Sequence, residues 1–243
     1  MCGRFCLHST IDPWIQLHFP GWESKGSGSA VPKSFNIAPA QSTIVCVGSK
    51  SAKSISTLEM TWGLHSRSSP AKDPGAILVN ARSETLDSKP SFREAFQFRR
   101  CLVLADGFYE WKTIGRKKQP YYFSPKAGGM FAMAGIWSNS QSQNSNRQRE
   151  ARFCVLTTSS NQILQGIHSR MPVILDPRTY KDWLCPSLSG TRELRALMKP
   201  VSSHLLQRWP VSRRVNRVGN NSSECIEAIA ENQVIQNRQR MLF

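Results

Sequence analysis

Residues 101–111 read Cys101-Leu102-Val103-Leu104-Ala105-Asp106-Gly107-Phe108-Tyr109-Glu110-Trp111. The run is apolar from Cys101 to Ala105, which is typical of a strand buried within a sheet or barrel. Shortly after it, Glu110 stands among aromatic residues. A carboxyl group half-buried in such surroundings has a raised pKa and can move protons near neutral pH. The stretch predicts a core strand that delivers an acid–base group, and a strand-end glutamate facing water is the alternative.

Short runs of the same kind recur along the chain, each bounded by Gly, Pro, Ser or Asn. They span Thr43–Val47, Leu58–Trp62, Ile77–Asn80, Cys101–Tyr109, Tyr121–Phe123, Phe131–Trp137, Phe153–Thr158 and Val173–Leu175. This pattern predicts mainly antiparallel sheets that form an open, barrel-like core. We find no internal repeats and no regular alternation of strands with helices, so an α+β fold is favoured over a doubly wound sheet.

Flanking helices are predicted from capping signals. They span Ile11–Phe19 after Thr10, Arg178–Leu184 after Asp176-Pro177, and Thr191–Met198. Loops are predicted for Glu23–Ala30, Ser66–Gly75 and Ser138–Glu150. Because long insertions at hairpin tips cost little, these loops need not separate domains. We expect one domain, residues 1–230, followed by a polar C-terminal segment, residues 231–243.

The composition is strongly basic. The 243 residues include 32 Lys or Arg against 16 Asp or Glu, which leaves a formal net charge of +16. Such a field attracts polyanions, of which nucleic acid is the most obvious. No apolar stretch approaches the roughly 18 residues of a membrane span, and no signal peptide is evident, so no membrane partner is expected. Seven scattered cysteines favour reduced thiols in an intracellular protein over a disulfide framework.

Cys2 stands directly after the initiator methionine. Removal of Met1 would leave one residue with a free α-amine and a thiol on adjacent carbons, with ordinary pKa values of about 8 and 8.5. Such a 1,2-aminothiol condenses with an aldehyde, first to a Schiff base and then, by ring closure through sulfur, to a thiazolidine. Taken alone, however, Cys2 is better read as an incidental small residue in a frayed terminus.

Two other segments place polar side chains two residues apart, on the same side of an extended chain. In the first, Asn80 can orient a nucleophile and Arg82 can hold a phosphate. In the second, His168 can act as acid or base near its ordinary pKa, and Arg170 adds a cation. Each pair alone is equally typical of turn or surface residues.

Basic and aromatic residues interleave along the chain, as in proteins that hold single-stranded nucleic acid. They include Arg4, Trp62, Arg82, Trp111 and Arg170. Most of the tryptophans fit a hydrophobic core equally well. No metal or other cofactor is expected, because Cys2, Cys6 and His8 lack the spacing of a metal knuckle and no second ligand pair follows.

Together these pieces resemble one family, the SOS-response-associated peptidases (SRAP). The shared motifs are Cys2-Gly3-Arg4-Phe5, Asn36-Ile37-Ala38-Pro39, Trp62-Gly63-Leu64, Asn80-x-Arg82-x-Glu84, Ala105–Trp111, Ile167-His168-x-Arg170-Met171-Pro172, and Val211-Ser212 with Val215-Asn216. They follow the family's order from residue 2 to the C-terminus. The stretch Asn220–Cys225 and the end of the chain resemble the eukaryotic branch. His65–Ser69 departs from the family's usual Pro-x-Trp stretch.

The resemblance implies a SRAP fold and a sensor of abasic sites in single-stranded DNA or at single-strand/double-strand junctions. In the implied mechanism, Cys2 forms a thiazolidine crosslink with the C1′ aldehyde of the abasic sugar and so shields the site during the response to DNA damage. Asn80 would orient Cys2 and the sugar, Glu110 would act as acid and base, and His168 would move protons at the sugar hydroxyl. The implied DNA contacts are Arg4, Asn36, Trp62, Arg82, Trp111 and Arg170.

Two alternative functions stay open. One is a thiol autopeptidase that removes its own leading residue with Cys2, Glu110 and His168. The other is a non-catalytic reader of modified or single-stranded DNA, for which the basic field would suffice. The resemblance also implies a monomer, contact with the replication machinery and a nuclear location.

Overall fold

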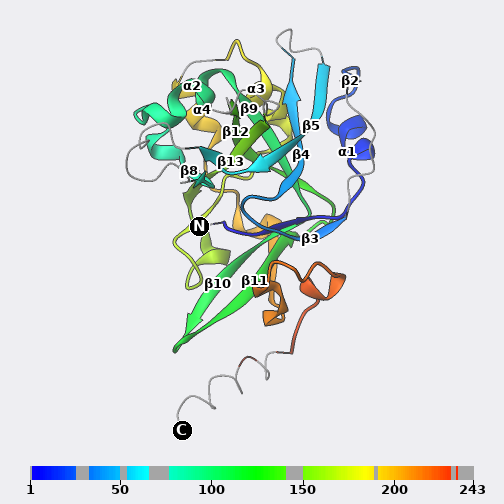
Figure 1. Cartoon of the computed structure of the whole chain (residues 1–243), viewed down its shortest axis with the longest axis vertical. Coiled ribbons are helices and arrows are strands. Elements are labelled where there is room, and N and C mark those ends of the chain that lie inside the picture. Colours follow the sequence, from blue (N-terminus) through cyan, green and yellow to red (C-terminus); the bar gives the residue numbers. More distant parts are fainter. Residues whose placement is uncertain are drawn as a thin grey trace.

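The structure is a computed structural model, and it describes residues 2–25, 33–49, 54–65, 77–140, 150–188, 191–230 and 234. Its centre is a five-stranded barrel (Figure 1) made of β4 (Ser42–Gly48), β5 (Ser54–Trp62), β9 (Arg100–Ala105), β12 (Phe131–Ser140) and β13 (Glu150–Ser159). Four neighbouring pairs are antiparallel, and a parallel pairing of β13 with β5 completes the ring. The predicted α+β fold with a barrel-like core is confirmed, and the barrel is closed.

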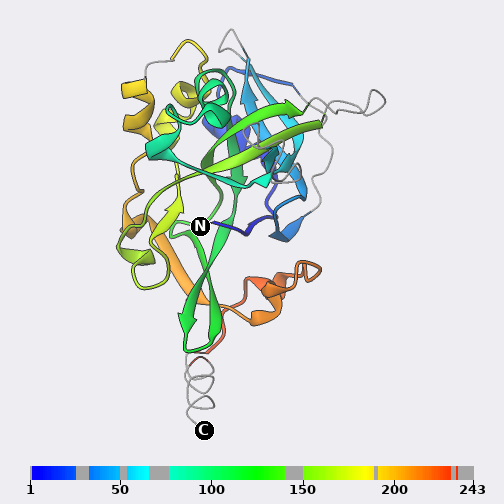
Figure 2. The same ribbon diagram turned by 60° about the vertical axis from the view of Figure 1, so that its left-hand side comes forward.

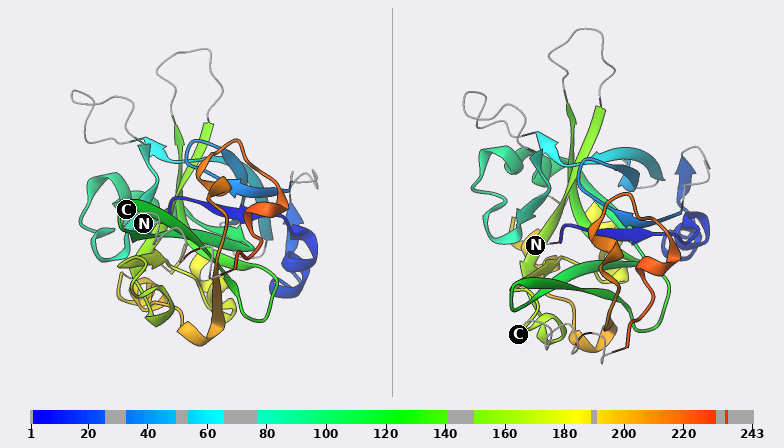
Figure 3. Two further views of the ribbon diagram at one scale, coloured as in Figure 1. Left: turned by 90° about the horizontal axis from the view of Figure 1, so that it is seen from below. Right: turned by 60° about the horizontal axis from the view of Figure 1, so that its bottom comes forward.

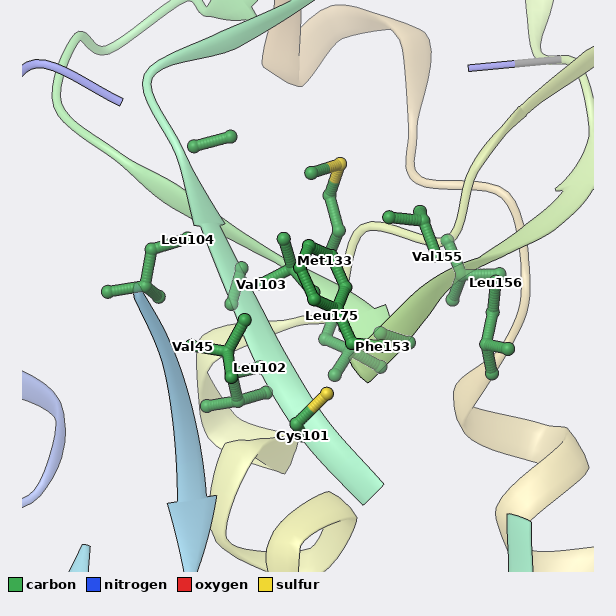
Figure 4. Close-up of a cluster of buried hydrophobic side chains, with 14 of the residues drawn as sticks. Val45, Cys101, Leu102, Val103, Leu104, Met133, Phe153, Val155, Leu156 and Leu175 are labelled. Carbon is green, nitrogen blue, oxygen red and sulfur yellow. The ribbon is translucent and has the colours of Figure 1, made fainter. Parts of the chain in front are cut away.

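Buried aliphatic and aromatic side chains fill the centre of the fold (Figure 4). Every residue of β9 is buried, which explains why the sequence is apolar from Cys101 to Ala105 without alternation. One side of this strand packs within the barrel, and α2 (Pro90–Phe98) and α3 (Tyr180–Leu184) contact it from outside. Strands covered on both faces have this continuous apolar pattern.

The predicted strand over Cys101–Tyr109 is in fact two strands in two different sheets. β9 ends at Ala105, and β10 (Gly107–Ile114) begins a second sheet. Asp106 separates the two strands, and its carboxylate accepts hydrogen bonds from the backbone N–H groups of His8 and Ser9 at 2.7 and 3.0 Å. Gly107 is required here, because a Cβ would lie 2.3 Å from the Tyr122 ring.

The second sheet is antiparallel and lies against one end of the barrel. Its order is β15 (Leu206–Pro210), β11 (Lys117–Pro125), β10, β1 (Phe5–Leu7) and β3 (Ser34–Ile37). Figures 1 and 2 show β10 and β11 as a long hairpin that points away from the barrel, while β1 crosses between the two. This arrangement brings the start of the chain to the junction of barrel and hairpin.

Shorter strands extend the barrel. β2 (Glu23–Lys25) pairs with β5, while β8 (Asn80–Arg82) and β14 (Arg170–Pro172) both pair with β13. β6 (Leu64–His65) and β7 (Ile77–Leu78) form a separate two-stranded sheet. The strand predicted at Val173–Leu175 begins earlier, as β14, and continues only as an isolated bridge at Ile174.

All three predicted helices are present. α1 (Ile11–His18) follows Thr10, and α4 spans Thr191–Leu197. The predicted helix at Arg178–Leu184 is a 3-10 turn, η3 (Pro177–Thr179), followed by α3, and the Asp176 side chain caps it by accepting from the Arg178 N–H. Figure 3 shows the helices lying around the barrel. Further 3-10 turns are η1 (Ser83–Thr85), η2 (Gln162–Leu164), η4 (Ser203–Leu205), η5 (Arg213–Asn216) and η6 (Ser223–Cys225).

One helix, α2, was absent from the sequence prediction. Its C-terminus meets that of α3 at Arg100, a buried arginine whose guanidinium donates hydrogen bonds to five backbone carbonyls from 96 to 188. Burial lowers the pKa of Arg100 to about 10. The side chain therefore caps both helices at once, since the last carbonyls of a helix have no partner within it.

Several predicted loops fall largely outside the described residues. These are residues 26–30 of the first loop, Ser66–Gly75, and residues 141–149 of the third; the segment 231–243 is also outside them, apart from residue 234. The first loop begins instead with the short strand β2. In the part of the chain that is described, no helix is long and apolar enough to cross a membrane.

Candidate active site

Cys2 lies just ahead of β1 and is completely buried. Its carbonyl oxygen accepts a 2.7 Å hydrogen bond from Nδ2 of Asn80, and its thiol lies 3.8 Å from the carbonyl oxygen of Arg4. That same Arg4 oxygen accepts from the N–H of Tyr109 on β10. Cys2 is thus held between β8 and β10, at the junction of the barrel and the second sheet.

Asn80 is brought to Cys2 by β8, which runs parallel to β13 with Asn80 opposite Val155. Its amide nitrogen is used in the bond to Cys2, whereas its buried Oδ1 has no hydrogen-bond partner among the described residues. An amide oxygen can accept two hydrogen bonds. The site therefore offers an acceptor within reach of a donor on Cys2 or on a bound molecule.

Glu110 lies on β10, three residues after the first residue of the strand, Gly107, and is 2% exposed. Burial raises the pKa of its carboxyl to about 7, and the positive charge of the amino terminus opposes this shift. The thiol pKa of Cys2 is also raised, first by burial and then by the charge of Glu110. Both groups are buried, and the charge of Glu110 acts on the Cys2 thiol through one low-dielectric environment.

His168 precedes β14 and is partly buried. Its Nδ1 lies 2.9 Å from the backbone nitrogen of Arg170 and 3.1 Å from the Arg170 carbonyl oxygen. It accepts from the N–H when the ring proton is on Nε2 and donates to the carbonyl when the proton is on Nδ1. Burial is the main reason that the pKa of His168 is lowered, with further contributions from the positive charges of the amino terminus, Arg170 and Lys118. The lowered pKa favours the neutral ring.

Arg82 and Arg170, two of the three arginines predicted to contact DNA, differ in their surroundings. Arg82 is exposed and takes part in none of the ion pairs found among the described residues. Arg170 instead makes a bidentate pair with Glu84, with N–O distances of 2.5 and 2.9 Å, and also donates to the Thr157 carbonyl. No role is predicted for Glu84 from the sequence, although its place in the Asn80-x-Arg82-x-Glu84 motif is a signal for one.

Arg4 joins the start of the chain to its C-terminal part. Its Nη1 donates to Oδ1 of Asn36 at 2.6 Å and to the Val215 carbonyl at 2.7 Å, and its guanidinium lies over the Trp111 ring. Burial lowers the pKa of Arg4. Trp111 is half-buried and donates through Nε1 to Asn216. Arg4 is therefore largely engaged within the protein.

Two of the predicted DNA contacts are buried and have partners within the protein. Trp62 is completely buried, donates to the Val79 carbonyl and packs edge-on against Phe5. Asn36 is 1% exposed, and its Nδ2 faces three carbonyls between residues 215 and 220. In this structure both side chains contribute to packing, and their contact with DNA stays a prediction. Among the described residues, no group of three His, Cys, Asp or Glu side chains is placed to hold a metal ion.

The site is thus a buried cysteine next to the amino terminus, at the edge of a closed barrel. Its carbonyl accepts a hydrogen bond from Asn80, and its thiol is electrostatically coupled to Glu110. The chain belongs to the SOS response associated peptidase (SRAP) family, which matches residues 1–218.

Several relatives of this chain are named for abasic sites. It is 35% identical over 229 residues to abasic site processing protein YoqW of Bacillus subtilis, covering 94% of this chain and 100% of that protein. Abasic site processing protein YedK of Escherichia coli is 29% identical, with the same coverage. HMCES of Xenopus tropicalis, also named an abasic site processing protein, is 30% identical over 87% of this chain and 70% of its own length.

Solved structures share the fold. A protein from Bacteroides thetaiotaomicron superposes with a TM-score of 0.80 at 24% identity, covering 94% of this chain and all of that one. A protein from Bordetella bronchiseptica gives a TM-score of 0.70 at 21% identity, covering 87% of this chain and all of that one.

Proposed function

We propose that this chain processes abasic sites in single-stranded DNA by forming a covalent thiazolidine crosslink through Cys2. The names of its relatives and its net charge of +16 support a role on damaged DNA. The observation that carries the chemistry is the hydrogen bond from Asn80 to the Cys2 carbonyl, beside a buried carboxyl whose pKa is about 7. This arrangement suits an aminothiol nucleophile with its own proton carrier.

The first half of the proposed reaction makes an imine. After Met1 is removed, the α-amine of Cys2 attacks the C1′ aldehyde carbon, and one amine proton passes to the carbonyl oxygen to give a carbinolamine. Glu110 then protonates the hydroxyl group, which leaves as water, and a protonated imine remains. A carboxyl with a pKa of about 7 is suited to this step, because it still holds a proton near neutral pH.

The second half closes the ring. The raised pKa of Cys2 keeps its thiol protonated at neutral pH, so ring closure needs a base. Glu110, now a carboxylate, takes the thiol proton while sulfur bonds to C1′ and the C=N electron pair returns to nitrogen. The products are a neutral thiazolidine and a protonated Glu110, so the carboxyl ends in its starting state.

Other residues have supporting roles in the proposal. The free Oδ1 of Asn80 accepts a hydrogen bond from the Cys2 amine and so aims its lone pair at the aldehyde. His168 donates its Nε2 proton to the sugar oxygen during ring opening. Arg82 holds a phosphate directly, whereas Arg170 exchanges Glu84 for a phosphate when DNA binds. Trp111, which is half-buried, contacts a base.

The test is a denaturing gel after incubation with abasic single-stranded DNA. We expect a heat-stable shifted band for the wild-type chain and none for Cys2→Ala. Glu110→Gln should slow the band's appearance about a hundredfold or more, the usual effect of losing a general acid or base. A band that persists in Cys2→Ala would rule out the N-terminal nucleophile. Binding without any covalent band would favour a non-catalytic reader.

The family is described as a peptidase, which favours a second activity that prepares the first: removal of Met1 by the chain itself. Mass spectrometry of the N-terminus separates the two activities. If the chain cleaves itself, Glu110→Gln or Cys2→Ala purified from the same host retains Met1, whereas wild type has lost it. If a host aminopeptidase removes it, all three chains begin at residue 2.

The proposed partner is single-stranded DNA, or a junction with duplex, bound by a monomer. Contact with the replication machinery and a nuclear location are proposed from the resemblance to the eukaryotic branch of the family alone. Imaging of a fluorescently tagged chain in its own cells, before and after damage that creates abasic sites, tests the location.

A further inference from the structure

The tip of the β10–β11 hairpin is a cluster of exposed cations. Ile114 pairs with Lys117, so Gly115 and Arg116 form a two-residue turn, and Gly115 takes the positive φ of 58° that such a turn needs at its first position. The exposed cations at this tip are Lys112, Arg116, Lys117 and Lys118. Figures 1 and 2 show that this end of the hairpin lies away from the barrel.

Among the described residues, no acidic side chain forms an ion pair with this cluster. The sequence contains no Asp or Glu from residue 111 to residue 149. The ion pairs that the described residues make through a Lys or Arg all lie elsewhere, on β2, α2, β13, β14, η3, α4 and η5. Four cations around one hairpin tip repel one another unless an anion binds between them. A polyanion is the ligand that this surface fits.

The hairpin also connects the cluster to the candidate active site. Glu110 is the fourth residue of β10, and Ile114 lies four residues further along the extended strand, a span of about 14 Å. The charge of Lys118 is among those that lower the pKa of His168, so the hairpin contributes to the potential at the site. A duplex arm that continues from an abasic sugar at Cys2 carries phosphates at a distance that the tip can reach.

We propose that the hairpin tip binds the phosphate backbone of a duplex arm that flanks the abasic site. This inference rests on the proposed function. At 3.4 Å per base pair, ~14 Å corresponds to about four base pairs. A duplex is stiff over this length, so it holds its phosphates at a fixed distance from the reacting sugar, as a flexible single strand does not. The tip makes the protein a reader of junctions through charge and distance, without base contacts.

The test uses a stable tetrahydrofuran abasic analogue, which has no aldehyde and reports binding alone. The variant is Lys112→Gln/Arg116→Gln/Lys117→Gln, which leaves Lys118 and its effect on His168 in place. The control removes the same charge from three exposed residues on the helical side, as Lys89→Gln/Arg192→Gln/Lys199→Gln. Fluorescence anisotropy measures Kd for a single strand and for junctions with a 12-base-pair arm on either side of the analogue.

With one of the two junctions, we expect the hairpin variant to bind about tenfold or more weakly than wild type, with a salt slope smaller by about 2 to 3, since each phosphate contact contributes about 0.9. Its Kd for the single strand and its crosslinking rate on a short aldehyde-bearing strand should change less than twofold. Neutral methylphosphonates at base pairs four to six of the arm should weaken junction binding by wild type to the same degree. They should leave junction binding by the variant unchanged.

Two results would overturn the inference: an equal loss in the control variant, or a hairpin variant that binds junctions as well as wild type. If wild type crosslinks the short strand and the hairpin variant binds junctions with the same Kd as wild type, only this inference fails. If no crosslink forms while the dependence on the arm persists, the proposed chemistry fails and the binding surface stands.

Discussion

Among single residues, Glu110 keeps a proton that an exposed glutamate would have lost, because burial raises its pKa from 4.5 to about 7. Below pH 4.5 the carboxyl is protonated in both the folded and the unfolded chain. Between pH 4.5 and 7 the unfolded chain releases its proton first, which favours unfolding. The contribution of Glu110 to stability is thus present at low pH and lost as pH rises, by about 3 kcal/mol in all.

Glu110→Gln should remove this pH dependence. Relative to wild type, its free energy of unfolding should rise by up to ~3 kcal/mol between pH 4 and pH 8, because glutamine never ionises. Urea denaturation at the two pH values measures the difference. Glu59→Gln, on the exposed face of β5, is the matched control and should show no comparable change. An equal difference between Glu110→Gln and wild type at both pH values would contradict a raised pKa.

The cysteines should differ sharply in reactivity. Six of the seven are buried, whereas Cys185 is only partly buried and its pKa is lowered, chiefly by the hydroxyl of Ser187 at 3.0 Å. Because the thiolate is the reactive form, a chromogenic disulfide reagent at pH 7.5 should label one thiol quickly in native Cys2→Ala protein, a background that lacks the proposed N-terminal nucleophile. Cys185→Ser should abolish this fast phase and Ser187→Ala should slow it. A fast phase that survives Cys185→Ser would show that another thiol is accessible.

Single residues also mark the limit of what the sequence predicts. Asn80, Glu110 and Cys2 could be selected from motif context, and the structure brings them together. Trp62 and Asn36 belong to equally clear motifs, yet their side chains bond to backbone carbonyls within the protein. A motif shows that a residue type is needed at a position, but it does not show whether that residue contacts a base or makes a hydrogen bond in the core. The partners come from other parts of the chain, Val79 and Phe153 for Trp62 and residues 215–220 for Asn36.

At the scale of elements, β3 is tied to the C-terminal segment mainly through Asn36. This side chain accepts from Arg4 and donates toward the carbonyls of Val215, Arg217 and Asn220. The same segment carries Asn216, the partner of Trp111. Docking of residues 211–229 therefore helps to hold the arginine whose backbone supports Cys2.

Asn36→Ala should destabilise the protein by about 2–4 kcal/mol, because several buried groups lose a partner. Hydrogen exchange should become faster in residues 211–229 and in β1, and remain unchanged in β12. Asn161→Ala, which loses a single bond to the Val201 carbonyl, is the control and should cost about 1 kcal/mol. Uniformly faster exchange throughout the chain would show global destabilisation instead of release of this segment.

Elements were predictable where local pattern and tertiary environment agree. The apolar runs at Thr43–Val47 and Phe153–Thr158 form barrel strands, and the Asp176-Pro177 signal starts a helix. The sequence pattern does not predict α2, although Phe92, Ala95 and Phe96 follow helical spacing. Phenylalanine has a higher preference for strands than for helices. The break between β9 and β10 could not be foreseen, because it depends on hydrogen bonds from His8 and Ser9 to Asp106.

At the scale of the whole molecule, charge has two opposing consequences. The described residues show seven ion pairs that use a Lys or Arg. Surface ion pairs contribute about 0–1 kcal/mol each, and salt weakens them. The net charge of +16 repels itself across the folded protein, and salt relieves this repulsion. With a net charge of this size, we expect relief of repulsion to outweigh the loss of ion pairs.

Raising NaCl from 20 to 300 mM should therefore raise the melting temperature of the free protein while it weakens binding to DNA, because each phosphate contact releases counterions into the more concentrated salt. The thermal shift should be a few degrees, and Kd should rise by about 10⁵-fold or more for about six phosphate contacts. Differential scanning calorimetry and anisotropy on the same samples measure both. Chloride is the suitable anion, since phosphate or sulfate would bind the hairpin tip itself. A melting temperature that falls with salt would mean that the ion pairs at Glu84, Asp87 and Glu224 stabilise the fold more than the excess charge destabilises it.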